Sequence, residues 1–298
     1  MSNTHLVLIT GASGQLGREL QRCSWPTGWK IVPCTRDELD LADFAAVASA
    51  VARRKWSAVI NAAAYTAVDA AEDDSIGAWT LNTLAPAALA QACRTAEIPL
   101  VHLSTDYVFD GAKAGAWSTA DAPSPLNVYG ASKLGGEIAI RASGVRHVIL
   151  RTAWLQSPYG SNFVKTMLRL AEQRSTISVV DDQRGSPTIA ADLAQTVMKI
   201  TMRLLTDAHA PGGLFHFSNA GTATWAELAE ETFRQSALRG GPQAVVKRIK
   251  SCEYSTRAAR PANSVLSHDE LRAAYQIEPR AWQLALEDLL DKLIGAKR

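Results

Sequence analysis

Short apolar runs alternate with helical patterns through the first half of the chain, and this alternation restricts the fold more than any other feature. Five runs have the length and composition of buried strands: 6–10, 30–34, 58–62, 100–104 and 147–151. The patterns between them predict helices over 15–23, 43–53, 75–96 and 129–142. Strands and helices that alternate in this way form a parallel sheet covered by helices. We therefore predict an α/β fold with a Rossmann-like, doubly wound parallel sheet.

A glycine-rich turn joins the first predicted strand to the first predicted helix. Gly11, Gly14 and Gly17 follow the spacing G-x-x-G-x-x-G. In a dinucleotide-binding turn, Gly11 allows the sharp bend, Gly14 lets the backbone approach a pyrophosphate, and Gly17 lets the helix pack close to the strand. The helix N-terminus then faces the phosphates. An ordinary glycine-rich loop is the alternative, but the strand–turn–helix context favours dinucleotide binding.

Polar and small residues follow four of the predicted strands at their carboxyl ends. They are the glycine turn, Thr35-Arg36, residues 61–66 and residues 104–106. In open parallel sheets, ligands bind beyond the carboxyl ends of the strands. The sequence therefore predicts one crevice to which four strand ends contribute.

Tyr129 and Lys133 lie four residues apart in a predicted helix, so their side chains project from the same face. A nearby ammonium favours ionisation of a phenol. A hydroxyl from the Ser104-Thr105 segment can complete a proton-transfer site. The Y-x-x-x-K pattern is common by itself, but beside the glycine turn it indicates a reductase site.

Composition excludes several other classes of protein. The 298 residues are 47% hydrophobic, and a net charge of +2 gives no reason to expect nucleic acid or an anionic membrane as a partner. No apolar run approaches the length of a membrane span, and residues 1–10 lack the pattern of a signal peptide. The four cysteines are scattered without a C-x-x-C pair, which predicts free thiols in the cytoplasm and no zinc site.

The second half has a different organisation. We assign 1–150 to an NAD(P)-binding Rossmann domain and 151–298 mainly to a smaller α/β substrate-binding domain. We leave open that one part of the second segment, about 185–220, belongs to the first domain, where 213–218 is a candidate strand. An amphipathic helix is predicted over 162–173, and capping boxes at Thr224–Glu227 and Ser267–Glu270 predict helix starts.

The glycine turn, the Tyr129/Lys133 pair and the Ser104-Thr105 hydroxyls together resemble the extended short-chain dehydrogenase/reductases. Longer blocks are similar to one family among them, the dTDP-4-dehydrorhamnose reductases. These blocks are 11–20, 61–69, 104–109, 125–133, 151–154, 162–168, 182–188 and 260–264. The resemblance covers nearly the whole chain, and its most specific parts are 61–69, 104–109 and Trp154.

The resemblance implies reduction of dTDP-4-dehydro-6-deoxy-L-mannose (dTDP-4-dehydrorhamnose) to dTDP-L-rhamnose, the last step of dTDP-L-rhamnose synthesis. Hydride from NAD(P)H reaches C4, and Tyr129 donates the proton. Lys133 is expected to lower the Tyr129 pKa and to bind the nicotinamide ribose. Thr105 is expected to bond the C4 oxygen or to tune Tyr129. Asp106 and Trp154, like Thr105, match substrate-binding positions, although packing in the core is an alternative for Trp154.

The cofactor is predicted to be NADPH, with NADH as the alternative. Arg36 follows the second strand and suits the 2′-phosphate of NADP, whereas Asp37 suits the 2′-hydroxyl of NAD. Arg36 could equally be a solvated surface charge. The predicted cofactor-binding residues are Gly11, Ser13, Gly14, Gln15, Leu16, Gly17, Arg36, Asp40, Leu41, Ala62, Ala63, Ala64, Tyr65, Thr66, Tyr129 and Lys133.

The resemblance leaves a metal doubtful. Some members are described as dimers in which glutamates hold magnesium at the interface, and Glu19 matches one such position. The matching segment 190–192 offers no clear glutamate. We therefore assign no metal ligand and do not expect a magnesium-bridged dimer, while a homodimer and the oligomeric state in general stay open.

Two other functions stay open at this point. One is a related nucleotide-sugar enzyme such as an epimerase, which retains its NAD through the cycle. The other is a non-catalytic, NADP-sensing regulatory subunit, although such a chain would be free to lose the Tyr129/Lys133 pair. The sequence also leaves open which of Arg184, Arg257 and Arg260 contacts the substrate diphosphate and which are surface charges.

Overall fold

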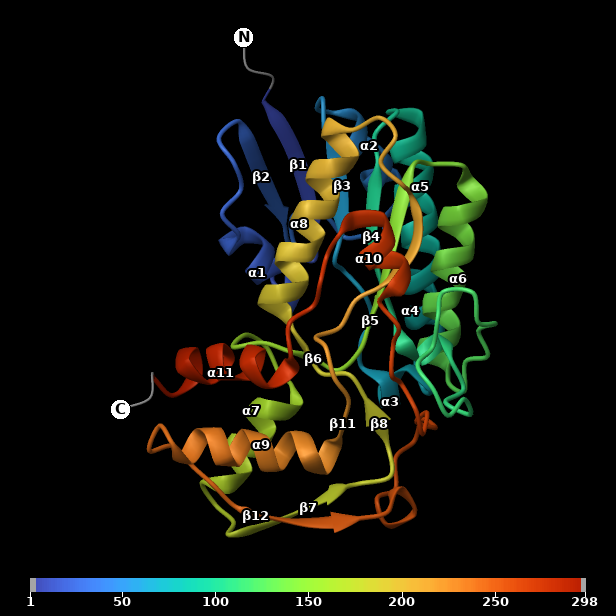
Figure 1. Ribbon diagram of the computed structural model, residues 1–298. Coiled ribbons are helices and arrows are strands. Elements are labelled where there is room, and N and C mark those ends of the chain that lie inside the picture. Colours follow the sequence, from blue (N-terminus) through green and yellow to red (C-terminus); the bar gives the residue numbers. More distant parts are fainter. Residues whose placement is uncertain (1–3, 296–298) are drawn as a thin grey trace.

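A parallel sheet of six strands forms the centre of the molecule. The computed structural model describes residues 4–295, and Figure 1 shows the sheet in the upper part of the molecule. The spatial order of the strands is β10-β5-β4-β3-β1-β2, and every neighbouring pair is parallel. Their bounds are β1 His5–Thr10, β2 Trp29–Cys34, β3 Ala58–Asn61, β4 Leu100–Thr105, β5 His147–Thr152 and β10 Gly213–His216. The predicted doubly wound α/β fold is confirmed.

Helices cover both faces of this sheet. One face carries α1 (Gln15–Arg22), α8 (Ala190–Thr206) and α10 (Asp269–Tyr275), and the other carries α2 (Phe44–Ala52), α5 (Ala85–Thr95) and α6 (Val128–Ser143). Figure 1 shows α1 and α8 on one side and α5 and α6 on the other. Alternate residues of β1 point to opposite faces, so Val7 and Ile9 enter the first core while Leu8 enters the second.

One predicted helix differs in detail. The pattern over 75–96 predicts a single helix, whereas the structure has α4 (Ser75–Trp79), a π-helical segment at Thr80–Leu84 and then α5. Pro86 has no N–H to donate to the preceding turn. Because one backbone hydrogen bond is missing, an irregular hydrogen-bond pattern is favoured at this point of the helix. The Asn82 carbonyl packs against Gly136 of α6, where a Cβ would lie 2.2 Å from it.

The chain leaves the sheet after β5 and returns to it for α8 and β10. The strand expected near 213–218 is present as β10, beside β5. The smaller lobe, below the sheet in Figure 1, contains α7 (Phe163–Ala171), α9 (Trp225–Ala237) and α11 (Trp282–Leu293). It also contains the parallel pair β7 (Thr176–Val180) and β12 (Val245–Ile249). Short strands complete the connections: β6 Leu155–Gln156, β8 Arg184–Gly185, β9 Thr188–Ile189 and β11 Ala223–Thr224.

The two predicted capping boxes have different outcomes. Thr224 caps α9, and its hydroxyl accepts from the Glu227 N–H while the Glu227 carboxylate accepts from the Thr224 N–H. The box at Ser267 is wrong, because α10 begins one residue later with His268 at its N-cap. Ser267 instead accepts from the Asp269 N–H. Within 4–295, no helix is both long and apolar enough to span a membrane.

Candidate active site

A cavity of about 660 Å³ opens at the carboxyl ends of the sheet strands. Residues that follow β1, β2, β3, β4 and β5 all line it, as the strand-end argument predicts. The predicted site residues that line it are Gly11, Ser13, Gly14, Gln15, Leu16, Arg36, Asp40, Leu41, Ala62, Ala63, Ala64, Thr66, Thr105, Asp106, Tyr129, Lys133 and Trp154. Lining residues that we did not predict include Leu81, Leu103, Tyr107, Thr152, Gly160, Ser161 and Leu193.

Two residues of the predicted cofactor set lie off the cavity. Gly17 faces the preceding turn instead, where a Cβ would lie 2.2 Å from the Gly11 carbonyl oxygen. Its role is the close packing of α1 against the turn. Tyr65 is held from outside the cavity by Asn82, which accepts from its N–H at 2.9 Å and donates to its carbonyl at 3.0 Å. Asn82 carries no recognisable motif and was missed.

The turn after β1 has the properties of a phosphate cradle. Gly11 has φ +70°, and a Cβ there would lie 2.6 Å from the Ala63 N. At the start of α1 the N-cap is Gly14, which has no side chain to bond the amides of the first turn. A helix N-terminus without a side-chain cap fits an anionic pyrophosphate. The residues present therefore fit a dinucleotide.

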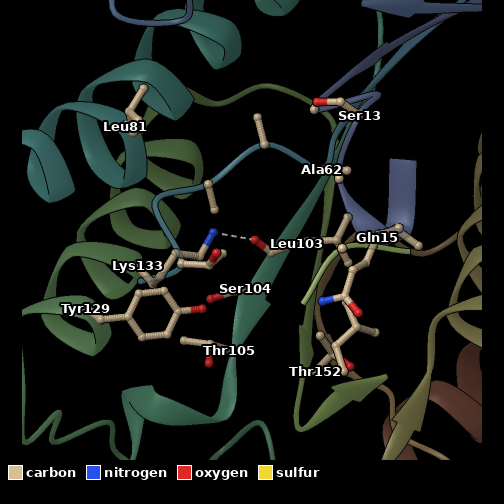
Figure 2. A pocket seen from close by; sticks show the side chains of 18 of the residues that line it. Ser13, Gln15, Ala62, Leu81, Leu103, Ser104, Thr105, Tyr129, Lys133 and Thr152 are labelled. Atoms are coloured by element: carbon tan, nitrogen blue, oxygen red, sulfur yellow. Dashed lines mark hydrogen bonds between the residues drawn. The ribbon is translucent and has the colours of Figure 1, made fainter. Parts of the chain in front are cut away.

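Tyr129, Lys133 and Thr105 lie close together on one side of the cavity (Figure 2). Tyr129 lies in the first turn of α6, and Lys133 follows one turn later on the same face. Burial raises the pKa of Tyr129 to about 12, opposed by a hydrogen bond with Thr105. This direction is opposite to the lowering expected from Lys133, whose Nζ donates instead to the Leu103 carbonyl at 2.6 Å. The phenol is therefore protonated at neutral pH, as a proton donor must be.

Asp106 lies beside this group and is fully buried. Its Oδ1 accepts from the Thr105 hydroxyl at 3.0 Å. Burial raises the pKa of the Asp106 carboxyl to about 6. A carboxyl with this pKa changes its charge within two pH units of neutrality. This change of charge takes place beside the Thr105 hydroxyl, which bonds Tyr129.

Trp154 forms the wall of the cavity on the side of the smaller lobe. It has φ +48°, an uncommon conformation for a bulky residue. Its ring stacks on Trp225, the first residue of α9, and Phe163 packs on the outer side of Trp225. Gly185 lies so close that a Cβ there would be 2.4 Å from the Trp154 Cε2. Packing therefore holds the ring where it lines the cavity, so packing and contact with a ligand are not alternatives for this residue.

A buried ion pair that we did not predict lies beneath the site. Arg151 on β5 and Glu137 on α6 are about 2% and 1% exposed. Arg151 donates to both carboxylate oxygens of Glu137, from Nε at 2.8 Å and from Nη2 at 2.6 Å. The Ser104 hydroxyl donates to the same carboxylate at 2.5 Å. This pair ties α6, which carries Tyr129, to two central strands.

At the far end of the cavity, Arg36 is the basic residue after β2. Its side chain is 77% exposed and lies 4.0 Å from the Asp40 carboxylate. Glu38 is turned back, with Oε2 accepting from the Thr35 N–H at 2.7 Å and the Thr35 hydroxyl at 2.9 Å. Asp37, the acidic residue that kept NADH open, is not a lining residue. At this end the cavity is lined by the cation Arg36, with Asp40 beside it.

The three arginines considered for a diphosphate differ in their surroundings. Arg257 is largely exposed and pairs with Asp73, and Arg184 is exposed on β8. Arg260 is only 17% exposed. It donates to Asp69 at 2.7 Å and lies over the ring of Tyr107, which lines the cavity.

Glu19, which matches a magnesium position of the family, lies beside a lysine. Glu19 is buried, and its Oε1 lies 3.8 Å from the Nζ of Lys292. The other segment that the resemblance indicates contributes Asp192, whose carboxylate is held by Arg280 at 2.8 Å and Asn219 at 2.6 Å. Among residues 4–295, no three His, Cys, Asp or Glu side chains gather in a way that could hold a metal ion.

Comparison with known proteins agrees with this geometry. A family model described as "RmlD substrate binding domain" matches residues 5–294. The dTDP-4-dehydrorhamnose reductase of Sinorhizobium fredii is 40% identical over 287 residues, covering 96% of this chain and 97% of its own length. The chain belongs to the dTDP-4-dehydrorhamnose reductase family. The family resemblance that the motifs indicated is thereby confirmed, and with it the assignment of the chain as an oxidoreductase.

Two further members of the same group show its range. The dTDP-4-keto-6-deoxy-D-glucose reductase of Streptomyces niveus is 39% identical and covers 94% of each chain. The crystal structure of dTDP-4-dehydrorhamnose reductase from Bacillus anthracis in complex with NADP is 35% identical, with a TM-score of 0.90. It covers 97% of this chain and 99% of its own. The ligand in that structure, NADP, is a nicotinamide dinucleotide.

Proposed function

We propose that the protein reduces dTDP-4-dehydrorhamnose to dTDP-L-rhamnose, with NADPH as the preferred cofactor. The single observation that supports this best is the joining, in one cavity, of the glycine turn, the Tyr129/Lys133/Thr105 group and the Trp154 wall. The turn, the catalytic group and the wall line the same cavity, which supports binding of a nicotinamide and a sugar beside Tyr129 together. Orientation of this kind supplies much of the rate in bimolecular reactions.

In the proposed reaction, Tyr129 donates its hydroxyl proton to the oxygen at C4 of the sugar. The reduced nicotinamide, when bound, supplies the hydride to that carbon. Thr105 holds the Tyr129 hydroxyl, and Lys133 stabilises negative charge on the phenolate that remains. Asp106 and Trp154 hold the sugar against this group.

NADPH is favoured because an exposed cation, Arg36, lines the cavity after β2. Arg36 is positioned to accept a 2′-phosphate. The acidic alternatives are engaged elsewhere: Glu38 bonds Thr35, and Asp40 accepts from the Ala42 N–H at 3.0 Å. We therefore assign the preference to NADPH over NADH.

A reductase for a related dTDP-4-keto sugar is the second candidate, because a relative with that name is nearly as similar in sequence. The deciding experiment is NADPH oxidation by the purified protein with dTDP-4-dehydrorhamnose generated in situ, beside dTDP-4-keto-6-deoxy-D-glucose. Faster turnover of the first supports the proposal, and faster turnover of the second supports the other candidate. Tightly bound NAD with no net NADPH consumption would instead identify an epimerase. NADPH binding with no turnover of either sugar would point to a regulatory subunit.

A further inference from the structure

A line of buried polar side chains extends from β1 to Lys133 behind the catalytic group. Thr10 on β1, Asn61 on β3, His102 on β4 and Lys133 on α6 are each no more than 2% exposed. The Thr10 hydroxyl donates to the Asn61 Oδ1 at 2.7 Å, and the Asn61 Nδ2 lies 3.0 Å from the His102 Nδ1. The His102 Nε2 lies 3.4 Å from the Lys133 Nζ.

The direction of each hydrogen bond in this line is fixed from one end. The Ala63 N–H is a backbone donor, and it lies 3.2 Å from the Asn61 Oδ1. The amide of Asn61 is thereby oriented with Nδ2 toward His102. Because Nδ2 carries only donors, the His102 Nδ1 must accept.

A neutral imidazole whose Nδ1 accepts carries its proton on Nε2. That N–H then points at the Nζ of Lys133, where an ammonium offers only further N–H groups. The other tautomer would relieve this contact at 3.4 Å but would place two N–H groups against each other across the shorter 3.0 Å contact with Asn61. The shorter contact decides the tautomer.

We propose that His102 is a positioning residue whose Nε2–H faces the Nζ of Lys133 and disfavours the ammonium form of that side chain. The importance of this contact for catalysis rests on the proposed function, in which Lys133 acts beside Tyr129. The Leu103 carbonyl accepts from either form of the lysine at 2.6 Å, so it holds the side chain in place without selecting its charge.

The surrounding charges agree with this assignment. Burial lowers the pKa of His102 well below its ordinary value, and the Lys133 and His147 charges act in the same direction. Burial also lowers the pKa of Lys133 to about 8, while Glu137 opposes this shift. Because Glu137 is engaged by Arg151 at 2.6 Å, its support for the ammonium is weakened. Lys133 therefore changes its charge near pH 8, while the lowered pKa of His102 keeps that ring neutral.

Nitrogen-15 NMR of the intact protein, labelled at the histidine rings, tests the tautomer without any assay of activity. We expect the His102 Nε2 to carry the proton and the Nδ1 to carry none from pH 6 to pH 9. A proton on Nδ1, or on both nitrogens, would overturn the proposal. Because neither substrate nor cofactor is present, failure of the proposed function would leave this result unchanged.

A second measurement follows the Lys133 side-chain nitrogen by NMR in the wild type and in His102→Gln. The glutamine amide can present its oxygen to Lys133, so proton loss from Lys133 should shift upward by about one pH unit. The alkaline limit of kcat should shift with it, while KM for NADPH stays the same. His268→Gln, a largely buried histidine bonded to Ser218, is the control and should shift neither. A Lys133 titration unchanged in His102→Gln would contradict the proposal.

Discussion

The rings of Trp154 and Trp225 stack with their centroids 3.5 Å apart and their planes 8° apart. One ring lines the cavity, and the other begins a helix of the smaller lobe. The position of the cavity wall is therefore fixed by the packing of that lobe.

Gly185→Ala should move Trp154, because the new Cβ would lie 2.4 Å from the indole Cε2. We expect KM for the sugar nucleotide to rise by about tenfold or more, with KM for NADPH little changed. Near-ultraviolet circular dichroism reports the loss of the stacked indole pair independently. Gly115→Ala is the matched control, since a Cβ there meets no atom within 4 Å. An unchanged sugar KM in Gly185→Ala would mean that the ring does not contact the substrate.

Tyr129→Phe should lower kcat by at least about 10²-fold, because a positioned proton donor contributes about 10²–10⁴-fold. Binding of NADPH, measured by fluorescence titration, should be largely retained. Tyr159→Phe serves as the matched control, because this residue lies outside the cavity. Near-normal turnover of Tyr129→Phe would remove it as the acid.

Arg36→Ala should lower the ratio of kcat/KM for NADPH to that for NADH. The expected loss is about tenfold, as for removal of one charge-assisted contact to a phosphate. Lys30→Ala, an exposed cation on the neighbouring strand β2, controls for the loss of surface charge. If both variants keep the wild-type ratio of kcat/KM for NADPH to that for NADH, Arg36 does not bind the 2′-phosphate.

Asp106 should make the protein less stable as the pH rises from about 4 to 6. Its carboxyl pKa is raised from 3.8 to about 6, so the folded state holds a proton that the unfolded state has lost in this window. The free energy of unfolding should therefore fall by about 2 kcal/mol across this window. In Asp106→Asn this fall should be absent, whereas exposed Asp37→Asn should retain it. Denaturant unfolding at pH 4 and pH 7 gives the free energy of unfolding of each protein at both pH values. An equal change in this free energy for the wild type and Asp106→Asn would refute the prediction.

Glu137→Gln should destabilise the fold by about 3–5 kcal/mol, because Arg151 would stay buried without its anion. The double variant Glu137→Leu/Arg151→Met removes both charges and should recover much of that loss. Chemical unfolding of the two proteins provides the measurement. A single variant as stable as the wild type would show that the pair is not a buried ion pair in solution.

Much of the fold and part of the site follow from local pattern. The strands and helices of the first half were predictable because buried parallel strands are continuous apolar runs. Glycines mark the turns between these elements. The side chains that the strand ends bring together follow from the rule for parallel sheets. Thr105, at the end of β4, was predictable for that reason, whereas Tyr129 and Lys133 were predictable from their four-residue spacing on a helix.

The parts of the fold and the site that could not be predicted from the sequence depend on contacts between distant segments. His102 and Asn61 lie 41 residues apart, and Trp154 meets Trp225 across the lobe boundary. No periodicity marks such pairs. The expected lowering of the Tyr129 pKa was wrong for a related reason, since burial by the folded chain raises this pKa and only the hydrogen bond with Thr105 opposes the shift. Ser267 satisfied a local capping pattern, but tertiary packing began the helix one residue later.

The return of β10 to the edge of the sheet has a consequence for synthesis of the protein. Until Gly213–His216 has emerged from the ribosome, β5 ends the sheet with unpaired N–H and C=O groups. A nascent chain that has formed only the first five strands therefore exposes an aggregation-prone sheet edge and is not yet a complete folding unit. A fragment that ends just after β5, at Thr152, should therefore aggregate.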